Sequence, residues 1–254
     1  MTEEAINLNF WDRFGLFIQD LAGKITFPVW GSFFFFLIRV VGRYRIERIQ
    51  EIRKQYQQLI KTARGPIILC ANHLTKIDSA LITWSLGSIW SYFRSFSHFS
   101  WNLPERSRYF SNRLLRIICY LGKCIPIDRG GERDLVNHSL DKIRYLLKKR
   151  NVVTIFPEGK RSLDGKIDAK DYSYGVGKLI GAVKDCKVVC IYLRGYGQKK
   201  FSSIPRLGEK FYVEMKQIQP SSVHQGIRAA RDLAEQIINQ LRCMEENYFA
   251  LCRQ

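Results

Sequence analysis

The chain has 254 residues, of which 46% are hydrophobic, enough for one sizeable core. Lys and Arg number 41 against 23 Asp and Glu, so the formal net charge is +18. This surplus predicts a negatively charged partner: phospholipid headgroups, phosphorylated substrates, acidic proteins or nucleic acid. The seven cysteines are odd in number and contain no Cys-x-x-Cys pair, which argues against a zinc site and predicts reduced thiols in a reducing compartment. The acidic start is not typical of a secretory signal.

Residues 1–45 differ in composition from the rest of the chain. Between residues 10 and 21, apolar side chains recur at helical spacing, which predicts an amphipathic helix. The run 25–38 carries no charge, but it is shorter than the roughly 20 residues of a simple spanning helix and contains Pro28 and Gly31. Basic residues flank it, where they can reach lipid phosphates. We predict a membrane-associating helical hairpin over 1–45; the alternative is a buried core helix.

Residues 46–254 are predicted to form one α/β domain in which strands alternate with helices. Strands are expected at 66–71, 122–129, 152–156, 187–193 and 211–216, and helices at 45–64, 79–92, 112–120, 134–149, 176–184 and from 221 or 222 to 241. Such alternation predicts a mostly parallel sheet with helices on its faces. The sequence has no internal repeat and no low-complexity linker, so the only boundary that we expect lies near residue 45.

The first candidate site is the run Asn72 to Asp78, directly after the strand at 66–71. His73 and Asp78 cannot touch within one regular helix or strand, because a separation of five residues points them in different directions. They can meet if the strand ends, a turn carries His73, and a helix begins near Asp78. His73 would then remove a proton from a hydroxyl while Asp78 fixes its tautomer. In the alternative, Thr75 and Asp78 form a capping box and Asp78 only accepts helix amides.

A second candidate site is the segment 156–162, at the end of another strand. Its proline stops ladder pairing, and Gly159 permits a tight turn. Lys160 and Arg161 then offer cationic donors beside exposed amides, which is a way to hold an anion. A solvated basic turn is the alternative. Arg129 has the same ambiguity, because a surface ion pair with Asp128 also accounts for it.

Taken in order, these segments resemble the glycerolipid acyltransferase family, most closely the 1-acylglycerol-3-phosphate acyltransferases. His73 and Asp78 match the family's His-x4-Asp motif, and the segments 122–129 and 156–162 resemble its second and third motifs. A fourth motif, a short apolar strand, is expected at 187–195. Each motif alone is weakly specific, but four in the right order are a strong match. The resemblance covers roughly residues 65 to 195.

The resemblance implies that His73 is the general base and Asp78 its partner. An acyl thioester, either acyl-CoA or acyl-ACP, would donate a fatty acyl group to the hydroxyl of a lysophospholipid, most simply lysophosphatidate. The residues that would bind the substrate are Gly122, Arg129, Glu158, Gly159, Lys160 and Arg161. No metal and no cofactor beyond the acyl donor is expected. Lys160 and Cys190 depart from the family pattern, which usually has Thr and Pro at these places.

The expected partners are membrane phospholipids, the lysophospholipid acceptor and the acyl carrier, and the expected location is the cytoplasmic face of a membrane. Another lysophospholipid or a lyso-aminolipid is the alternative acceptor. A basic nucleic-acid-binding protein is compatible with the charge, but the basic residues are dispersed and no recognition motif is present. An inactive membrane scaffold is a further alternative, against which the intact His73 and Asp78 argue. We therefore predict a lipid acyltransferase and no nucleic-acid partner.

Overall fold

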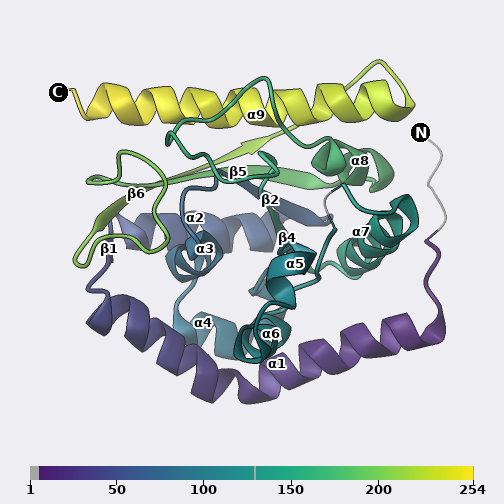
Figure 1. Cartoon of the computed structure of the whole chain (residues 1–254), viewed down its shortest axis with the longest axis horizontal. Coiled ribbons are helices and arrows are strands. Elements are labelled where there is room, and N and C mark those ends of the chain that lie inside the picture. Colours follow the sequence, from purple (N-terminus) through teal and green to yellow (C-terminus); the bar gives the residue numbers. More distant parts are fainter. Residues whose placement is uncertain (1–5, 129, 254) are drawn as a thin grey trace.

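The computed structural model describes residues 6–128 and 130–253, and within them six strands form one sheet (Figure 1). The strand order is β1-β6-β5-β2-β4-β3, and every neighbouring pair is parallel except β5 and β6. The strands are β1 (Arg45–Ile46), β2 (Ile67–Ala71), β3 (Trp101–Asn102), β4 (Val152–Ile155), β5 (Lys187–Gly195) and β6 (Lys210–Ile218). The predicted α/β class with a mostly parallel sheet is confirmed.

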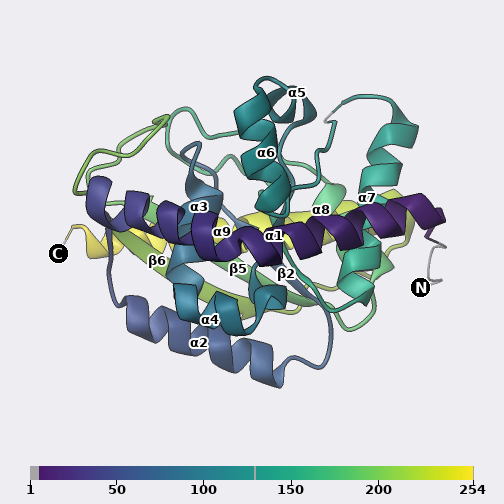
Figure 2. The ribbon, with the colours of Figure 1, turned by 90° about the horizontal axis from the view of Figure 1, so that it is seen from below.

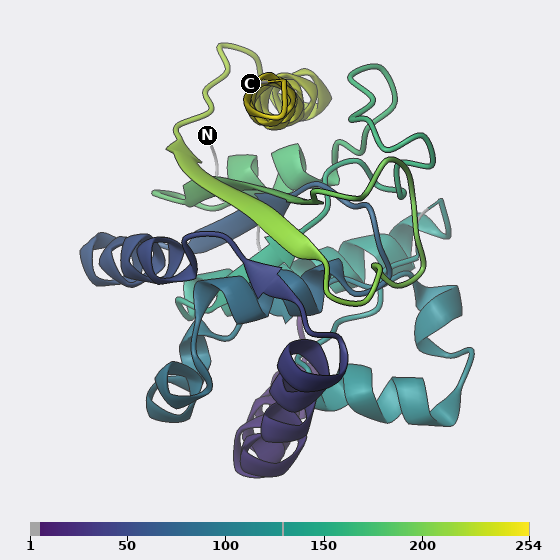
Figure 3. The ribbon, with the colours of Figure 1, turned by 90° about the vertical axis from the view of Figure 1, so that its left-hand side faces the viewer.

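Helices cover both faces of this sheet. They are α1 (Phe10–Phe36), α2 (Ile49–Thr62), α3 (Asp78–Leu86), α4 (Ile89–Arg94), α5 (Arg106–Tyr109), α6 (Arg113–Leu121), α7 (Arg133–Lys148), α8 (Gly175–Ala182) and α9 (Gly226–Leu251). The core on one face joins the sheet to α7, α8 and α9, and the core on the other face joins it to α2 and α3. Figure 3 shows α9 on one side of the sheet and α1 on the opposite side.

The central strand β2 shows why its sequence is apolar without alternation. Ile68 and Cys70 point into the core beneath α7, α8 and α9, whereas Ile67, Leu69 and Ala71 point into the core beneath α2 and α3. Because helices cover both faces of the sheet, side chains that point to either face are shielded from water. All five residues of β2 are therefore buried. The same condition holds for β4, which is buried along its whole length.

The expected N-terminal hairpin is wrong in its shape: residues 10–36 form one helix, α1, which continues as a π-helical turn over Leu37–Val41. Pro28 lies inside α1 and does not end it. A proline removes one helical hydrogen bond and bends a helix, and Figure 1 shows α1 bent near its middle.

Packing explains why the helix continues through Pro28. The neighbouring Phe27 is 1% exposed and lies among the rings of Tyr92, Phe96 and Phe99. A Cβ atom at Gly31 would come within 2.5 Å of the Phe27 ring, so this glycine makes room for the ring one turn away. The glycine that we interpreted as a hairpin signal therefore serves side-chain packing within a single helix.

The stretch Phe10–Val41 is, among the described residues, the one helical segment long and apolar enough to cross a membrane, judged by length and composition. Only 22% of its most apolar window is buried within the protein. Seen from below in Figure 2, α1 runs along the length of the molecule with α4 and α6 on either side of it. The alternative of a buried core helix fits this exposure poorly.

Other boundaries differ from those predicted. Arg45–Ile46 pairs with β6 as a strand, so the helix expected from residue 45 begins only at Ile49. The helix expected at 79–92 is divided at Gly87, where a Cβ atom would come within 2.4 Å of the Tyr92 ring. The segment 122–128 forms isolated bridges rather than a regular strand. The final helix begins at Gly226, with Gln225 as its N-cap in place of the expected Ser221 or Ser222, and it runs on to Leu251.

Candidate active site

The carboxyl ends of three adjacent strands meet at one edge of the sheet. β2 lies between β4 and β5 and pairs in parallel with both. The loops that follow these strands are therefore neighbours, and this is where open α/β sheets place their ligands. The loop after β2 carries His73, and the loop after β4 carries Glu158. Parallel pairing thus brings two segments 85 residues apart into direct contact.

Asn72 fixes the point at which the chain leaves the sheet. Its side-chain Nδ2 donates to the Leu193 carbonyl at 3.0 Å, and its Oδ1 accepts from the Leu193 N–H at 2.7 Å. The side chain thus occupies both the donor and the acceptor of one residue of β5. Asn72 is 1% exposed, so these bonds form away from water. Our sequence interpretation treated Asn72 only as part of the motif and missed this role.

The structure brings His73 and Asp78 together. His73 Nδ1 lies 2.8 Å from Asp78 Oδ2, and the exposed fraction of the side chain is 13% for His73 and 3% for Asp78. The contact arises as the spacing required: β2 ends at Ala71, the turn carries His73, and Asp78 is the first residue of α3. The catalytic roles of the two residues stay a prediction.

Asp78 also organises the loop that carries His73. Its Oδ2 accepts from the backbone N–H groups of Leu74 at 2.6 Å and Thr75 at 2.7 Å, and its Oδ1 accepts from the Thr75 hydroxyl. The Thr75 hydroxyl oxygen in turn accepts from the Ile77 N–H at 3.1 Å. These amides belong to the loop before α3, whose N-cap Ile77 has no side-chain cap bond, so Asp78 does not only accept helix amides as the capping alternative expected. The same carboxylate contacts the imidazole.

The segment after β4 contacts both the ring and the backbone of His73. The His73 ring stacks on the Phe156 ring with centroids 4.2 Å apart and an interplanar angle of 24°. The His73 N–H donates to Glu158 Oε1 at 2.8 Å, and the His73 carbonyl accepts from the Ser162 N–H at 3.1 Å. Ring stacking and two backbone hydrogen bonds leave the histidine little freedom to rotate. The first and third motifs thus form one unit.

Glu158 is a buried carboxyl group, only 4% exposed. The pKa of Glu158 is raised to about 8, chiefly by burial; the nearby carboxylates of Glu245, Asp78 and Asp164 contribute to this rise, and the hydrogen bond from the His73 backbone N–H opposes it. At neutral pH, Glu158 therefore carries its proton in most molecules. The carboxyl group of Glu158 contacts the backbone of the loop that carries His73. A role of Glu158 in substrate binding stays a prediction.

The other predicted binding residues lie in several places. Gly159 has φ +70°, a conformation that favours glycine, and its N–H donates to the Phe156 carbonyl at 3.0 Å. Lys160 is mostly exposed and pairs with Asp171, which raises the pKa of Lys160. Arg161 is half-buried, and Gly122 ends α6 with its N–H on the Ile118 carbonyl at 2.8 Å. Arg129 lies outside the described residues.

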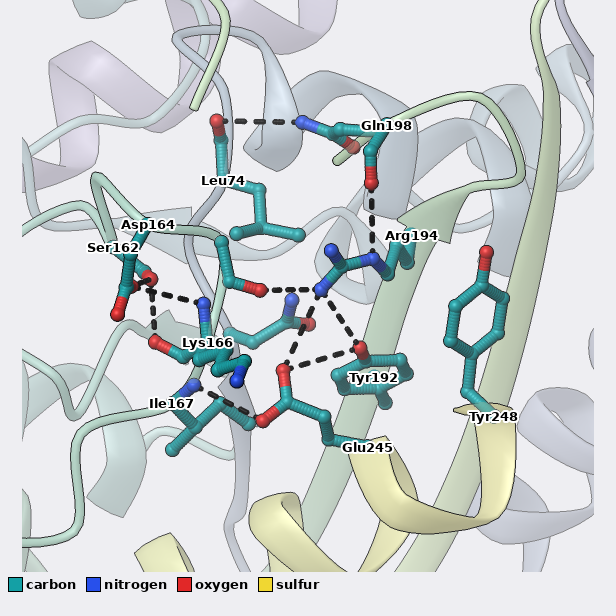
Figure 4. Close-up of polar contacts among 12 residues, drawn as sticks. Leu74, Ser162, Asp164, Lys166, Ile167, Tyr192, Arg194, Gln198, Glu245 and Tyr248 are labelled. Atoms are coloured by element: carbon teal, nitrogen blue, oxygen red, sulfur yellow. Dashed lines mark hydrogen bonds and ion pairs between the residues drawn. The ribbon is translucent and has the colours of Figure 1, made fainter. Parts of the chain in front are cut away.

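Sequence reasoning missed a buried arginine at the end of β5. Arg194 is 3% exposed, and its guanidinium Nη1 lies 3.5 Å from Glu245 Oε1 and 3.4 Å from the Tyr192 hydroxyl (Figure 4). Its nitrogens also donate to the carbonyls of Gly165, Gln198 and Lys199. The fork of the guanidinium suits several acceptors at once. A charged residue directly after the apolar predicted strand at 187–193 was the available signal.

The Arg194 cluster connects the C-terminal helix to the loops around the histidine. Glu245, on α9, accepts from the Ile167 N–H at 3.1 Å, and Gln198 Nε2 donates to the Leu74 carbonyl at 3.4 Å (Figure 4). Leu74 is the residue after His73. Burial raises the pKa of Glu245, and Arg194 opposes that shift. Through these bonds, α9 and the loops after β4 and β5 are joined to the loop that carries the imidazole.

Among residues 6–128 and 130–253, no group of three or more His, Cys, Asp or Glu side chains is arranged to hold a metal ion. What the site does contain is an imidazole 2.8 Å from a buried carboxylate, at the carboxyl-terminal edge of the parallel strands. Such a pair can accept a proton from a nucleophile without a covalent intermediate.

Comparison with known proteins points in the same direction as the motifs. A family model described as Acyltransferase matches residues 38–194, which is more than half of the chain. Tafazzin of Drosophila melanogaster is 25% identical over 139 residues, covering 52% of this chain and 34% of that protein. The alignment thus spans about a third of the length of this relative. The family match contains β2, His73, Asp78, β4 and the segment 156–162, and the chain belongs to the acyltransferase family.

Proposed function

We propose that this protein transfers a fatty acyl group from an acyl thioester to the hydroxyl of a lysophospholipid, with lysophosphatidate as the leading acceptor. The observation that carries the proposal is the 2.8 Å contact between His73 Nδ1 and Asp78 Oδ2 at the carboxyl end of β2. Membership of the acyltransferase family gives the reaction class. The acceptor and the donor follow from the resemblance of the four motifs and are part of the proposal.

The chemistry follows from the tautomer that Asp78 selects. With Nδ1–H donating to the carboxylate, the basic lone pair of His73 is on Nε2. Nε2 takes the proton of the acceptor hydroxyl as its oxygen bonds to the thioester carbonyl carbon. The C–S bond then breaks, the ester forms, and the proton passes from the imidazolium to the departing thiolate. Asp78 stabilises the imidazolium between these steps.

Asp78 is well placed for that role because its orientation is fixed. Two backbone amides and one hydroxyl hold the carboxylate, so it need not reorganise when the imidazole becomes charged. Phe156 and Glu158 restrain the ring and the backbone of His73. We propose that Glu158 contributes by holding this loop, with its neutral carboxyl group beneath the histidine.

Several features support a lipid acceptor at a membrane. The long helix α1 exposes most of its apolar residues, and the chain carries a net charge of +18, which suits anionic phospholipid. Cationic side chains at Lys160 and Arg161 follow Glu158 in the loop after β4. We propose a membrane-associated enzyme that works on the cytoplasmic face and takes its acyl group from acyl-CoA or acyl-ACP.

The test is the His73→Ala variant, assayed with acyl-CoA or acyl-ACP and lysophosphatidate. Without the base, we expect kcat to fall by about 10²- to 10⁴-fold. His224→Ala is the matched control, because that imidazole is 51% exposed and lies outside the site. Wild-type turnover by His73→Ala, with His224→Ala equally active, would remove the base from the mechanism.

An acceptor panel tests the substrate class separately. Lysophosphatidate, other lysophospholipids and a lyso-aminolipid are compared at equal concentration, with each acyl carrier in turn. We expect the highest kcat/KM with lysophosphatidate. A higher value for an acceptor without an exposed phosphate monoester would overturn this acceptor while leaving the reaction class intact.

A further inference from the structure

Helix α6 carries an apolar stripe that the protein does not cover. Leu114, Ile117, Ile118 and Leu121 follow the spacing i, i+3, i+4 and i+7, which in a soluble helix marks the face turned to the core. Here the first three are 65%, 56% and 44% exposed, and no described residue of α6 is buried. A stripe of this kind on the surface marks a binding face.

The carboxyl end of α6 is attached to the middle of α1. Gln19 Nε2 donates to the carbonyls of Tyr120 at 3.0 Å and Cys124 at 2.9 Å. Just after α6, the buried Lys123 pairs with Asp20 of α1 at 2.9 Å. These bonds fix the position of α6 relative to α1, so the exposed faces of the two helices have a defined arrangement.

The two helices also pack closely where they meet. A Cβ atom at Gly23 would come within 2.7 Å of the Leu121 carbonyl oxygen, so only glycine allows this approach. Figures 1 and 3 show α1, α4 and α6 together on the side of the molecule opposite α9. Exposed large apolar side chains on these three helices include Phe10, Trp11, Phe14, Phe17, Ile25, Val29, Phe33, Phe36, Trp90, Leu114, Ile117 and Ile118.

The charges around α6 indicate what covers it. The segment 106–121 contains arginines and no acidic residue. The guanidinium groups of Arg106 and Arg116 lie 5.3 Å and 5.2 Å from the centre of the Phe110 ring, and Phe110 is itself 48% exposed. Aliphatic and aromatic side chains bordered by arginines are typical of a helix that lies in the interface of an anionic membrane.

We propose that α6 is a second membrane-contacting helix, which inserts Leu114, Ile117 and Ile118 among anionic phospholipids beside α1. This inference rests on the proposed function, because an enzyme that acylates a lipid needs to contact the membrane in which that lipid lies. α6 leads directly into Gly122 and the segment 122–128, which carries the second motif. Seating α6 on the bilayer therefore places that segment at the membrane, where acceptor lipid enters.

The test measures how the full-length chain binds vesicles of phosphatidylcholine with and without an anionic phospholipid. The variant Leu114→Ser/Ile117→Ser/Ile118→Ser removes exposed apolar surface, and we expect it to lower the partition coefficient by about tenfold or more. The control Leu207→Ser/Val223→Ser/Ile227→Ser removes side chains that are 70%, 95% and 67% exposed, outside α1, α4 and α6. Equal binding by the α6 variant and the control would overturn the proposal.

A second pair of variants tests the charges. Arg113→Gln/Arg116→Gln should reduce the preference for anionic vesicles, whereas Arg228→Gln/Arg242→Gln on α9 should not. If α6 instead covers a second copy of this chain, light scattering will show a dimer that the α6 variant dissociates while vesicle binding is unchanged, and that result also overturns the proposal.

Activity separates this inference from the proposed function. In detergent micelles, the α6 serine variant should turn over lysophosphatidate as the wild type does, and it should lose activity only on vesicles. A variant that binds vesicles normally refutes the role of α6, whatever the fate of the reaction. The reaction itself is judged by His73→Ala in micelles, where α6 is not needed.

Discussion

The buried carboxyl group of Glu158 gives a prediction that can be worked out in magnitude. Glu158→Gln keeps a carbonyl oxygen that can accept from the His73 N–H, which donates to Oε1 at 2.8 Å in the wild type. The substitution removes the ionisation. Burial raises the pKa of Glu158 from its usual 4.5 to about 8, so the wild type carries a pH-dependent contribution that the variant lacks.

The sign follows from the protons bound by each state. Below pH 4.5, Glu158 is protonated in both the folded and the unfolded chain, and its contribution to stability is fully present. As pH rises toward about 8, the unfolded chain gives up the proton while the folded protein retains it, so the free energy of unfolding falls. A pKa difference of about 3.5 corresponds to at most about 5 kcal/mol across this interval.

The assay is denaturant unfolding of the wild type and of Glu158→Gln from about pH 5 to about pH 8. Part of that total falls outside this pH range, so between pH 5 and pH 8 we expect the variant to gain about 3–4 kcal/mol of stability relative to the wild type. An unsatisfied amide in the variant would cost about 1–3 kcal/mol, but that cost does not change with pH. The slope of the difference against pH therefore isolates the ionisation.

Glu235→Gln is the matched control, because this glutamate is exposed on α9. Its stability should follow that of the wild type at every pH. A difference between Glu158→Gln and the wild type that stays constant from pH 5 to pH 8 would refute the reasoning, because it would mean that Glu158 ionises alike in both states.

Three further predictions concern the loop, the buried ion pair and helix packing. Asp78→Asn should fold, since an amide oxygen still accepts from the loop amides, but kcat should fall by about 10²-fold or more; an unchanged kcat would contradict the orienting role. Arg194→Met should destabilise by about 3–5 kcal/mol by leaving Glu245 unpaired, and adding Glu245→Gln should restore part of this loss in a thermal melt. If the double variant melts no higher, the loss comes from packing. Gly177→Ala should destabilise the folded protein by about 1–3 kcal/mol, because its Cβ would lie 1.8 Å from a carbonyl oxygen of α9. The control Gly15→Ala has open space around it and should be neutral or stabilising. Equal denaturation midpoints for the two variants would contradict this.

The sequence determined the class of the fold and the place of the histidine loop. Strands β2, β4 and β5 are recognisable because side chains on both faces are apolar, and this pattern is local. The position of His73 and Asp78 at a strand-to-helix transition is also local, since the end of β2 and the start of α3 are within seven residues of each other. Their contact required no knowledge of distant segments.

Tertiary structure alone decided the support of the site and the shape of the N-terminus. Glu158 reaches His73 across 85 residues, and Arg194 reaches Glu245 across 51, so no periodicity reveals either contact. Pro28 and Gly31 indicate a break when considered locally. The burial of Phe27 against rings from residues 92–99 stabilises one continuous helix instead. Packing between segments far apart in the chain contributes more free energy than the local preference of Pro28 and Gly31 for ending a helix. A short window of sequence cannot reveal such packing, because the partner residues lie outside it.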